Sequence, residues 1–544
     1  MSSLELKDDG RIARTGSSVR SSSRIERYAA LLLCLLIIFG FDLRLRGISD
    51  VGLAEDEARK IEAVRAYRAG DITANAEHPM LMKSLILISL LAAEKLNSAF
   101  DARISDEAAV RFPNLLFGAL TALPIFLLSS ALFNKGIGLI AAALWSTGIN
   151  AITYNRIAKE DTLLVFFMLF AFYFYLRAKQ MDYRQPARKR RAYILSGLSF
   201  GLMLASKYLP HYFGLNMLYH HLVHVRERKP DELPGRTPAI FYFVMGSAFL
   251  LANPAVLLPE TWHYLTSYTS EQLLTHHGYL MGERLYPNQV SSTPFGTPIY
   301  FYLLFLAIKT PLPLLAALLI GLVIIMRRWR EPGPAFLLLM FLFWIVPYSL
   351  IGAKWLRYAL SLMAFVYMIA AVGIAWIAYE AKRALEALTK RAARVATIAL
   401  TLIWVFGPLS AVWASGPHYG LYVNRLYRGR AGYYFPHDEL YDDGLREALL
   451  FVCRHAPPEA TIAHETPSAT RYYLERYGRT DLRARPLSAP DFSPASAPHP
   501  TFFILQRGRT YFENRAEMAE VRATAHKVYE VVINGVTAAE VYVR

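Results

Sequence analysis

Long apolar runs separated by short polar loops make up most of the first 414 residues. A helix needs about 20 apolar residues to cross a bilayer, and many runs reach that length. We therefore predict a polytopic helical membrane protein with about eleven spans, and up to thirteen. The runs lie near 28–47, 81–99, 109–132, 136–153, 160–180, 191–225 (a hairpin), 238–260, 298–326, 335–352, 358–379 and 394–414.

The basic residues predict which loops face the cytoplasm. The polar, Ser-rich residues 1–27 carry five arginines, so we expect a disordered cytoplasmic N-terminus and an uncleaved anchor at 28–47. Alternation then places 48–80, 154–160, 261–297 and the chain after 415 on the opposite side. The cytoplasmic loops are Arg184–Arg191, Arg226–Arg236, Arg327–Arg330 and Lys382–Arg394.

One run conflicts with this alternation. Loops 48–80 and 154–160 need an even number of crossings between them, yet three apolar runs lie there. The run 81–99 carries Lys83, Glu94 and Lys95, and we expect that it does not span.

The sequence from 415 to 544 has the mixed pattern of a small soluble domain. Residues 445–456 show helical periodicity, and 501–505 is an apolar run typical of a strand. Residues 527–544 indicate a hairpin that turns at Asn534-Gly535, a type I′ signal. We predict an α/β or α+β domain outside the membrane.

Composition and charge narrow the function classes. The chain is 54% hydrophobic and 19% charged, which excludes a disordered chain, a coiled coil and an ordinary soluble enzyme. The net charge of +16 comes largely from basic loops, so it indicates topology and no nucleic-acid partner. There is no P-loop, strand-associated GxGxxG, HExxH or GxSxG motif, which argues against a nucleotide-driven pump, a soluble-cofactor oxidoreductase, a zinc protease and a serine hydrolase.

Two acidic clusters stand at the predicted outer mouths of membrane helices. The first is Glu55-Asp56-Glu57 and the second ends in Glu160-Asp161. Either alone fits a helix start, where acids complement the helix dipole or cap the helix. Two such clusters on one side of a membrane are harder to explain as caps, because ionisable groups at that depth are costly and tend to be functional.

Basic side chains at the edges of the apolar runs are candidates for binding an anionic head group. Taken singly, each is interpreted as an anchor whose charged group reaches the membrane surface. Lys207 differs because it lies midway through the run 191–225, and loop 261–297 is expected to face substrate, with only a weak zinc signal at its paired histidines. The candidates are His78, Lys83, Arg111, Lys207, Lys309, Lys354 and Arg357, with His276 and His277 in the loop.

In their order along the chain, these motifs resemble the membrane glycosyltransferases of the GT-C fold. They are most similar to the dolichyl-phosphate-mannose–protein mannosyltransferases and the aminoarabinose transferase of lipid A. The resemblance covers about residues 28–380; Met80 and Met82 replace a Pro and a Gly of the family pattern, and Lys159-Glu160 adds charge beside Asp161. The matching motifs are Asp56-Glu57-Ala58-Arg59, Gly70-Asp71, Glu77 to Lys83, Arg111-Phe112-Pro113 with Gly118, Arg156 to Asp161, Gly201 to Tyr208, His277 to Gly282, Lys309-Thr310-Pro311 and Lys354 to Tyr358.

The resemblance implies a sugar donor linked to a polyprenyl monophosphate, and direct displacement with inversion at the anomeric carbon. Asp56 is then the catalytic base, and Glu57 and Asp161 orient the acceptor or the base. His78, Lys83, Lys207 and Arg357 would bind the donor phosphate. No cofactor is certain: a divalent cation between Asp56 and Asp161 is possible, although the resemblance does not require it. Further substrate-binding candidates are Glu77, Arg111, Arg156, Glu160, His276, His277, Lys309, Lys354 and Tyr358.

Three other functions stay open at this point. They are a flippase or transporter of a lipid-linked sugar, a ligase of the same fold that uses a lipid-diphosphate donor, and a structural subunit with a dead site. The sugar is open, and the acceptor can be a protein, a lipid or a glycan. The Arg- and Ala-rich composition suggests a bacterium, which would place the chain in the plasma membrane with its site and its C-terminal domain on the periplasmic side.

Overall fold

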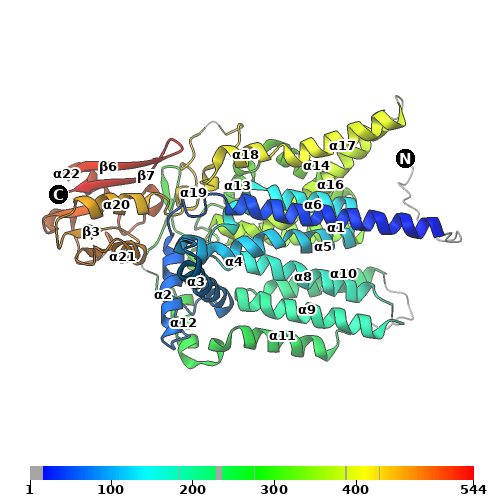
Figure 1. Ribbon diagram of the computed structural model, residues 1–544, viewed down its shortest axis with the longest axis horizontal. Helices are drawn as coiled ribbons and strands as arrows, with labels where there is room; N and C mark the ends of the chain where they lie inside the picture. Colours follow the sequence, from blue (N-terminus) through cyan, green and yellow to red (C-terminus); the bar gives the residue numbers. More distant parts are fainter. Residues whose placement is uncertain (1–15, 183, 228–235, 275, 386–388, 428) are drawn as a thin grey trace.

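The computed structural model describes residues 16–182, 184–227, 236–274, 276–385, 389–427 and 429–544. A bundle of helices runs along the long axis, and a small domain with a β-sheet sits at one end (Figure 1). Helix α1 (Gly16–Leu45) begins at the opposite end of the bundle from this domain. Arg11 and Arg14 and parts of two basic loops, 228–235 and 386–388, lie outside the described residues.

The apolar runs fold into the helices of the bundle. Among the described residues, six helices are long and apolar enough to cross a membrane, or seven if α6 and α7, bent by 55°, count as one span. The prediction of a polytopic helical membrane protein is confirmed. The eleven to thirteen spans predicted from the sequence also include shorter helices, such as the apolar α11 and α14. The bundle helices are α1 (Gly16–Leu45), α4 (Asp106–Leu120), α5 (Ala122–Leu132), α6 (Lys135–Thr147), α7 (Ile149–Asn155), α8 (Asp161–Gln180), α9 (Pro186–Ser206), α10 (His211–Glu227), α11 (Ala239–Ala252), α13 (Phe301–Lys309), α14 (Leu312–Arg327), α15 (Pro332–Leu350), α16 (Ala359–Leu385), α17 (Lys390–Phe406) and α18 (Leu409–Ser415).

Three boundaries differ from the sequence pattern. Helix α1 begins at Gly16, so residues 16–27, expected to be disordered, are helical. The run 191–225 divides into α9 and α10, as expected for a hairpin, and the run 298–326 breaks between α13 and α14. The second break falls before Pro311, which has no N–H to continue a helix.

Helix α16 forms the centre of the bundle, and every residue from Ala359 to Ile374 is buried. Its contact with α14 depends on two glycines. A Cβ on Gly373 would lie 2.1 Å from the carbonyl oxygen of Ala317, and a Cβ on Gly321 equally close to that of Ile369. Only glycine therefore permits the two backbones to approach so closely.

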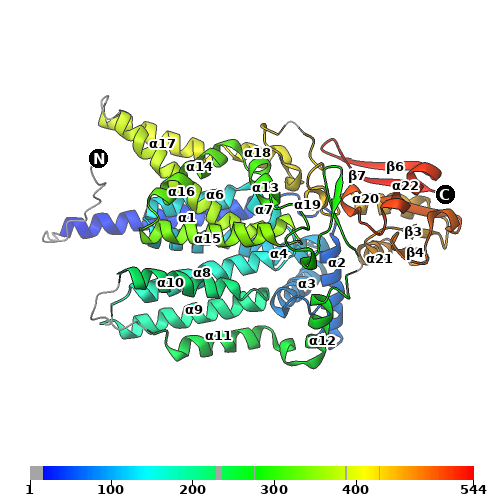
Figure 2. The same cartoon turned by 180° about the vertical axis from the view of Figure 1, so that it is seen from behind.

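Three helices lie across the end of the bundle beside the C-terminal domain. They are α2 (Glu55–Arg68), α3 (Met80–Phe100) and α12 (Pro259–Thr269), which follows the 3₁₀ turn η1 (Pro254–Leu257). Figures 1 and 2 show α2 upright across the bundle and α3 turned away from the bundle direction. Helix α3 is not among the described candidate spans, as expected from its charges.

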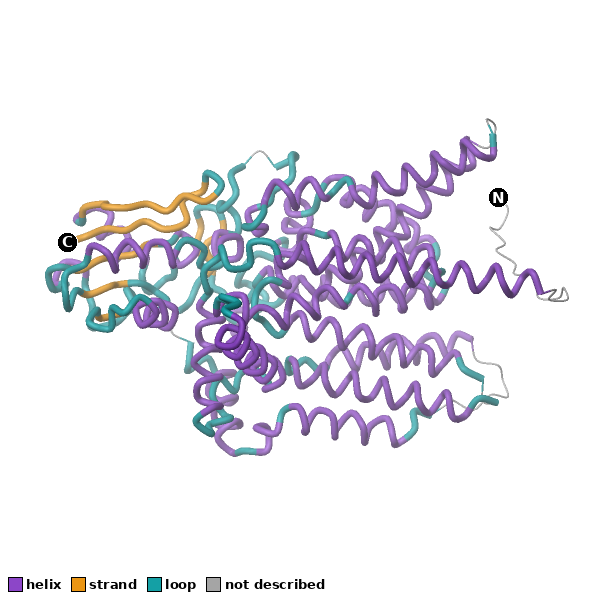
Figure 3. Tube along the Cα trace, in the orientation of Figure 1, coloured by secondary structure: helices purple, strands orange, loops and turns teal. Residues whose placement is uncertain are grey.

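The C-terminal domain has a five-stranded mixed sheet of order β4-β3-β5-β7-β6, as predicted for an α/β or α+β domain. Strands gather at this end of the molecule (Figure 3). The predicted hairpin is confirmed: Ile533 pairs with Val536, and Asn534 and Gly535 both have positive φ, as a type I′ turn requires. The elements are η4 (Tyr419–Leu421), α19 (Pro436–Leu440), α20 (Leu445–His455), β3 (Thr461–Ala463), α21 (Pro467–Arg476), β4 (Arg483–Arg485), η5 (Pro494–Ser496), β5 (Thr501–Leu505), η6 (Arg507–Arg509), α22 (Arg515–Thr524), β6 (His526–Ile533) and β7 (Val536–Val543).

The C-terminal domain and the bundle end share one hydrophobic core. Ile61 and Val64 of α2 belong to the same buried cluster as Leu449 of α20 and Tyr473 of α21. The hydroxyl of Tyr473 also accepts a hydrogen bond from the backbone N–H of Leu53, at 2.6 Å. The domain is therefore fixed against the segment that carries the first acidic cluster.

Candidate active site at the end of the bundle

The first acidic cluster divides among three different partners. Helix α2 begins at Glu55, and Glu57 accepts a hydrogen bond from the N–H of Ala54 at 3.1 Å, which caps the helix. The Glu55 carboxylate pairs with Arg509 of the C-terminal domain at 2.8 Å. Asp56, between the two, faces a cluster of charged side chains, so neighbours in sequence have separate surroundings.

Glu57 is committed to a buried ion pair. Both of its oxygens accept hydrogen bonds from Arg111, at 2.9 and 2.6 Å, and Glu57 is fully buried. Arg111 also donates to the backbone carbonyls of Ile48, Val51 and Gly52. The Glu57–Arg111 pair thus joins α2 to α4 and to the loop before α2.

Asp56 lies at the centre of the site. Its Oδ1 is 2.8 Å from the ammonium of Lys159, and its Oδ2 accepts a hydrogen bond from the hydroxyl of Tyr441 at 2.5 Å and lies 3.9 Å from Arg357. Its side chain is 30% exposed, so it remains accessible from outside. Burial alone would raise the pKa of Asp56, but Lys159, Arg357 and Lys60 hold it well below its ordinary value.

The second acidic cluster lies against the first. Glu160 pairs with Lys60 of α2 at 2.9 Å, and both side chains are 1% exposed. The Nδ1 of His78 lies 3.9 Å from Glu160. Burial lowers the pKa of His78 well below its ordinary value, although Glu160 acts in the opposite direction, so the imidazole is neutral at pH 7.

Asp161 begins α8 and faces the neighbouring helix pair. Its Oδ1 is 2.7 Å from the ammonium of Lys207, at the tip between α9 and α10. The same ammonium lies 4.4 Å from the centre of the Tyr358 ring. The other oxygen of Asp161 is buried and has no hydrogen-bond partner among the described residues. We call the joined set the ion-pair cluster; it comprises Asp56, Lys60, His78, Lys159, Glu160, Asp161, Lys207 and Arg357.

An apolar groove of about 650 Å³ opens beside the ion-pair cluster. Its walls come from α10 and α15 and include Leu215, Leu218 and Phe343. Lys207 and Tyr358 also line it, so one part of the groove borders the cluster. The groove can hold a hydrocarbon chain while a charged group attached to that chain meets Lys207.

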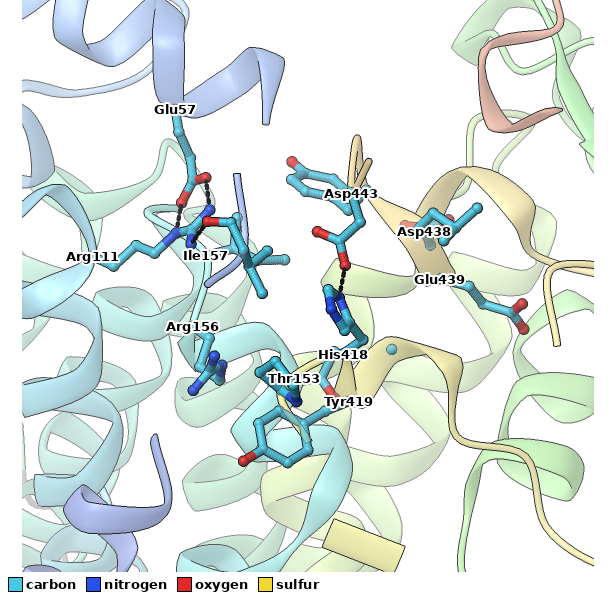
Figure 4. Close-up of a pocket in the computed structure, with 15 residues that line it drawn as sticks. Glu57, Arg111, Thr153, Arg156, Ile157, His418, Tyr419, Asp438, Glu439 and Asp443 are labelled. Atoms are coloured by element: carbon cyan, nitrogen blue, oxygen red, sulfur yellow. Dashed lines mark hydrogen bonds and ion pairs between the residues drawn. The ribbon is translucent and has the colours of Figure 1, made fainter. Parts of the chain in front are cut away.

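A second, smaller cavity of about 60 Å³ lies between the bundle and the C-terminal domain. Figure 4 shows the Glu57–Arg111 pair at one side and His418 bonded to Asp443 at the other. Asp438 and Glu439 also line it. Burial raises the pKa of Asp438 to about 6, against the effect of its hydrogen bond from Tyr279. The cavity is too small for a sugar, and its polar groups are largely paired with one another.

Several predicted site residues lie apart from the ion-pair cluster and bond to backbone carbonyls. Lys83 donates to the carbonyls of Ala74, Asn75 and His78, and so shapes the loop before α3. The other three that bond in this way are Arg156 (to the carbonyls of Arg44, Arg46 and Gly47), Lys309 (to those of Gly420 and Tyr422, with an ion pair to Glu439) and Lys354 (to those of Thr297 and Ile351).

The remaining predicted residues contact other side chains. His276 lies 3.6 Å from Glu465. His277 is bonded to Glu513 at 2.5 Å. Both histidines therefore join loop 261–297 to the C-terminal domain and stand apart from Asp56. Glu77 accepts a hydrogen bond from Asn75 within its own loop.

Three members of this site were not predicted as site residues from the sequence. Lys159, which holds Asp56, was expected only to add charge beside Asp161. Lys60 lies one helical turn after Asp56, so its place beside a second acid could have been suspected from helix spacing. Tyr441 lies 385 residues from Asp56, and no pattern in the sequence connects them.

The donor set does not fit a divalent cation between Asp56 and Asp161. Each carboxylate is bonded to a lysine ammonium, and that positive charge opposes a metal ion at the same oxygen. In the described part of the chain, no three His, Cys, Asp or Glu side chains are grouped so that they could hold one.

Comparisons with solved structures return membrane glycosyltransferases at low identity. ArnT from Cupriavidus metallidurans bound to undecaprenyl phosphate is 13% identical, with a TM-score of 0.49, over 95% of this chain and 98% of that one. The oligosaccharyltransferase AglB from Archaeoglobus fulgidus, with an inhibitory peptide and a dolichol-phosphate, is 11% identical, with a TM-score of 0.45, over 94% and 74%. The arabinofuranosyltransferase AftD from Mycobacteria is 13% identical, with a TM-score of 0.42, over 95% and 40%.

No curated protein sequence matches the chain. A family model does: residues 99–257 match the one described as Dolichyl-phosphate-mannose-protein mannosyltransferase. This segment contains the second acidic cluster and Lys207. The match confirms the resemblance predicted from the sequence, and with it the prediction of a membrane glycosyltransferase similar to the protein mannosyltransferases.

Proposed function

We propose that the protein transfers a sugar from a polyprenyl monophosphate to an acceptor hydroxyl, with inversion, at the outer face of the membrane. The observation that carries this proposal is the apolar groove bordered by Lys207 and Tyr358, next to the ion-pair cluster around Asp56. A lipid-linked sugar phosphate has the same two parts, a long hydrocarbon chain and an anionic head.

Each part of the donor would have its own place along the groove and its cations. The polyprenyl chain would lie between α10 and α15, and its phosphate would meet Lys207 and Arg357. Arg357 is 3.9 Å from Asp56, so the sugar attached to that phosphate would lie near the Asp56 carboxylate. A base and a phosphate site this close suit displacement at the carbon that joins sugar to phosphate.

The charge balance of the ion-pair cluster favours the departing phosphate. With His78 neutral, the cluster holds three carboxylates and four cations, an excess of one positive charge. The donor phosphodiester carries one negative charge, and the released phosphomonoester carries about 1.5 to 2 at neutral pH. The site therefore attracts the leaving group more strongly as the bond breaks, which is the condition for catalysis.

The reaction needs one base, and Asp56 is placed for it. The acceptor oxygen forms a bond to the anomeric carbon as the carbon–oxygen bond to phosphate breaks. The bonding pair leaves with the phosphate, and the acceptor proton passes to Asp56. Positioned base catalysis contributes roughly 10²–10⁴-fold.

The low pKa of Asp56 makes it a weak base in the free protein. A bound donor phosphate would compete with Asp56 for Arg357. Losing part of that positive neighbour raises the pKa of Asp56, so donor binding would itself strengthen the base.

In the proposed orientation, the bundle end with the C-terminal domain would face the periplasm, with the N-terminus in the cytoplasm of a bacterial cell.

The test is transfer in liposomes by three forms of the protein. Wild type, Asp56→Asn and the control Glu62→Gln each receive a crude envelope acceptor fraction and radiolabelled undecaprenyl- and decaprenyl-phosphate sugars or, in parallel, the corresponding lipid-diphosphate sugars. Glu62 lies on the same helix, and its side chain is 45% exposed. We expect transfer by wild type and the control, and at least a 100-fold loss in Asp56→Asn with undecaprenyl phosphate binding retained.

Other outcomes reject the proposal. Movement of donor across the bilayer without transfer would indicate a flippase. Transfer only from a lipid diphosphate would indicate a ligase. Transfer by Asp56→Asn near the wild-type rate would remove Asp56 as the base and make Asp161 the next candidate. No activity from wild type with any donor would fit a structural subunit.

A further inference from the structure

One hydrogen bond to Asp56 comes from the C-terminal domain, although every other partner of this carboxylate belongs to α2 or the bundle. Tyr441 follows α19 directly, and its hydroxyl donates to Asp56 Oδ2 at 2.5 Å. The Tyr441 ring also lies 5.9 Å from the guanidinium of Arg357. A single side chain of this domain thus touches both the proposed base and a proposed phosphate ligand.

The backbone at Tyr441 is held in an unusual conformation. Tyr441 and Asp442 have φ of 46° and 68°, in the left-handed region that non-glycine residues rarely adopt. Such residues are strained and persist only where the surroundings hold them. The surroundings here are specific, because Asp442 accepts hydrogen bonds from Arg509 and, at 2.9 Å, from the backbone N–H of Glu55.

The helical turn before Tyr441 is tied to the other half of the site. Asp438 of α19 accepts hydrogen bonds from the hydroxyl of Tyr279 at 2.6 Å and from the backbone N–H of Leu356 at 2.9 Å. Leu356 directly precedes Arg357. Residues 436–443 therefore join the residue before Asp56 to the residue before Arg357, and they fix the spacing of the two groups.

The hydrogen-bond capacity of Asp56 shows what this arrangement does. A carboxylate offers about four acceptor sites. Lys159 takes one on Oδ1, and Tyr441 takes one on Oδ2. With both oxygens held, the carboxylate cannot rotate, and its remaining lone pairs keep one direction for an acceptor hydroxyl.

We propose that Tyr441 is a positioning residue of the transfer reaction, and that residues 436–443 of the C-terminal domain complete the active site by orienting Asp56. This inference rests on the proposed function. Tyr441 acts through Asp56, so its loss should slow the chemical step and leave donor binding intact.

The experiment compares Tyr441→Phe with Tyr472→Phe. Tyr472 makes the same kind of bond across the same interface, because its hydroxyl donates to Asp106 of α4 at 2.6 Å. Each change removes one oxygen atom and one tyrosine–aspartate hydrogen bond. Both variants are assayed in liposomes with the undecaprenyl-phosphate sugar that wild type transfers, and their unfolding midpoints and affinities for undecaprenyl phosphate are measured.

We expect Tyr441→Phe to lower kcat by about 10- to 100-fold, as for loss of a hydrogen bond to a charged group. Its donor KM and its affinity for undecaprenyl phosphate should stay within about twofold of wild type, because binding does not use the bond. Tyr472→Phe should keep kcat within about twofold, with an unfolding midpoint similar to that of Tyr441→Phe.

Three results would overturn the inference. Equal kcat in the two variants would mean that Tyr441 only fastens the domain. A loss confined to KM or to undecaprenyl phosphate binding would make it a binding residue. If Asp56→Asn is inactive and Tyr441→Phe is unchanged, the proposed function stands and only the positioning role fails, whereas inactive wild-type protein rejects both.

Discussion

The ion pair between Glu57 and Arg111 gives Glu57 a structural role, which separates it from its neighbour Asp56, the proposed base. We predict that Arg111→Met strongly destabilises the protein. Glu57 is fully buried and accepts two hydrogen bonds from Arg111, so the change leaves a carboxylate with no counter-charge. Breaking one partner of such a pair costs about 3–5 kcal/mol.

That cost corresponds to a change of roughly 150- to 5,000-fold in the unfolding equilibrium, at 1.36 kcal/mol per factor of ten. The assay is denaturant unfolding of purified protein in mild detergent, followed by tryptophan fluorescence. Arg103→Met is the matched control, because Arg103 pairs with Asp101 at 3.1 Å with both side chains about 80% exposed. An exposed pair of this kind contributes about 0–1 kcal/mol.

The double variant Glu57→Gln/Arg111→Met completes the test. Removing both charges should recover part of the lost stability, since no unpaired carboxylate then remains in the core. The carbonyls that Arg111 bonds in the loop before α2 still lose their donor, so the recovery is incomplete. The double variant should also retain sugar transfer, because Glu57 faces Arg111 and not the ion-pair cluster. The reasoning is refuted if Arg111→Met is as stable as Arg103→Met, or if a folded double variant loses transfer as completely as Asp56→Asn.

Three further predictions address other parts of the molecule. Burial lowers the pKa of His78, so below about pH 6.5 the unfolded chain binds a proton that the folded chain does not. The unfolding midpoint should therefore be lower at pH 5 than at pH 7, and His78→Asn should reduce that difference. Lys207→Met, combined with Asp161→Asn to avoid a stranded carboxylate, should weaken undecaprenyl phosphate binding by about 10- to 100-fold in a direct binding assay; a change under about twofold would remove Lys207 from the phosphate site. Gly118→Ala should lower stability by about 1–3 kcal/mol in the unfolding assay, because its Cβ would lie 2.5 Å from Asn155 Cγ.

Local signals were enough to predict the fold class and the C-terminal hairpin. Apolar runs of membrane length need no tertiary information, and Asn534-Gly535 specifies its turn through positive φ at both residues. Boundaries were less predictable: the start of α1 at Gly16 lies within a polar segment with no apolar face to mark it.

The site was predictable as a set of charged residues but not as a set of pairs. Spacing within α2 cannot show that Glu57 contacts Arg111 while Asp56 contacts Lys159, because Arg111 comes from α4 and Lys159 from the loop before α8. The position of Tyr441 depends on the docking of a domain almost 400 residues away. Pairings of this kind depend on tertiary packing, which no local pattern in the sequence encodes.

The partners of each cation also indicate which charges are able to serve a ligand. Lys83 and Lys354 are bonded to backbone carbonyls, and moving them would leave buried acceptors unsatisfied, at about 1–3 kcal/mol each. Arg357 instead faces Asp56, which is 30% exposed, so a phosphate that draws the guanidinium away leaves a carboxylate that water or an acceptor hydroxyl can solvate. A cation paired with a partly exposed carboxylate can exchange partners at low cost, and a cation bonded to buried backbone carbonyls cannot. By this measure Arg357, whose partner Asp56 is 30% exposed, exchanges partners more easily than Lys207, whose partner Asp161 is 7% exposed, and Arg357 is therefore the first cation that the proposed phosphate would engage.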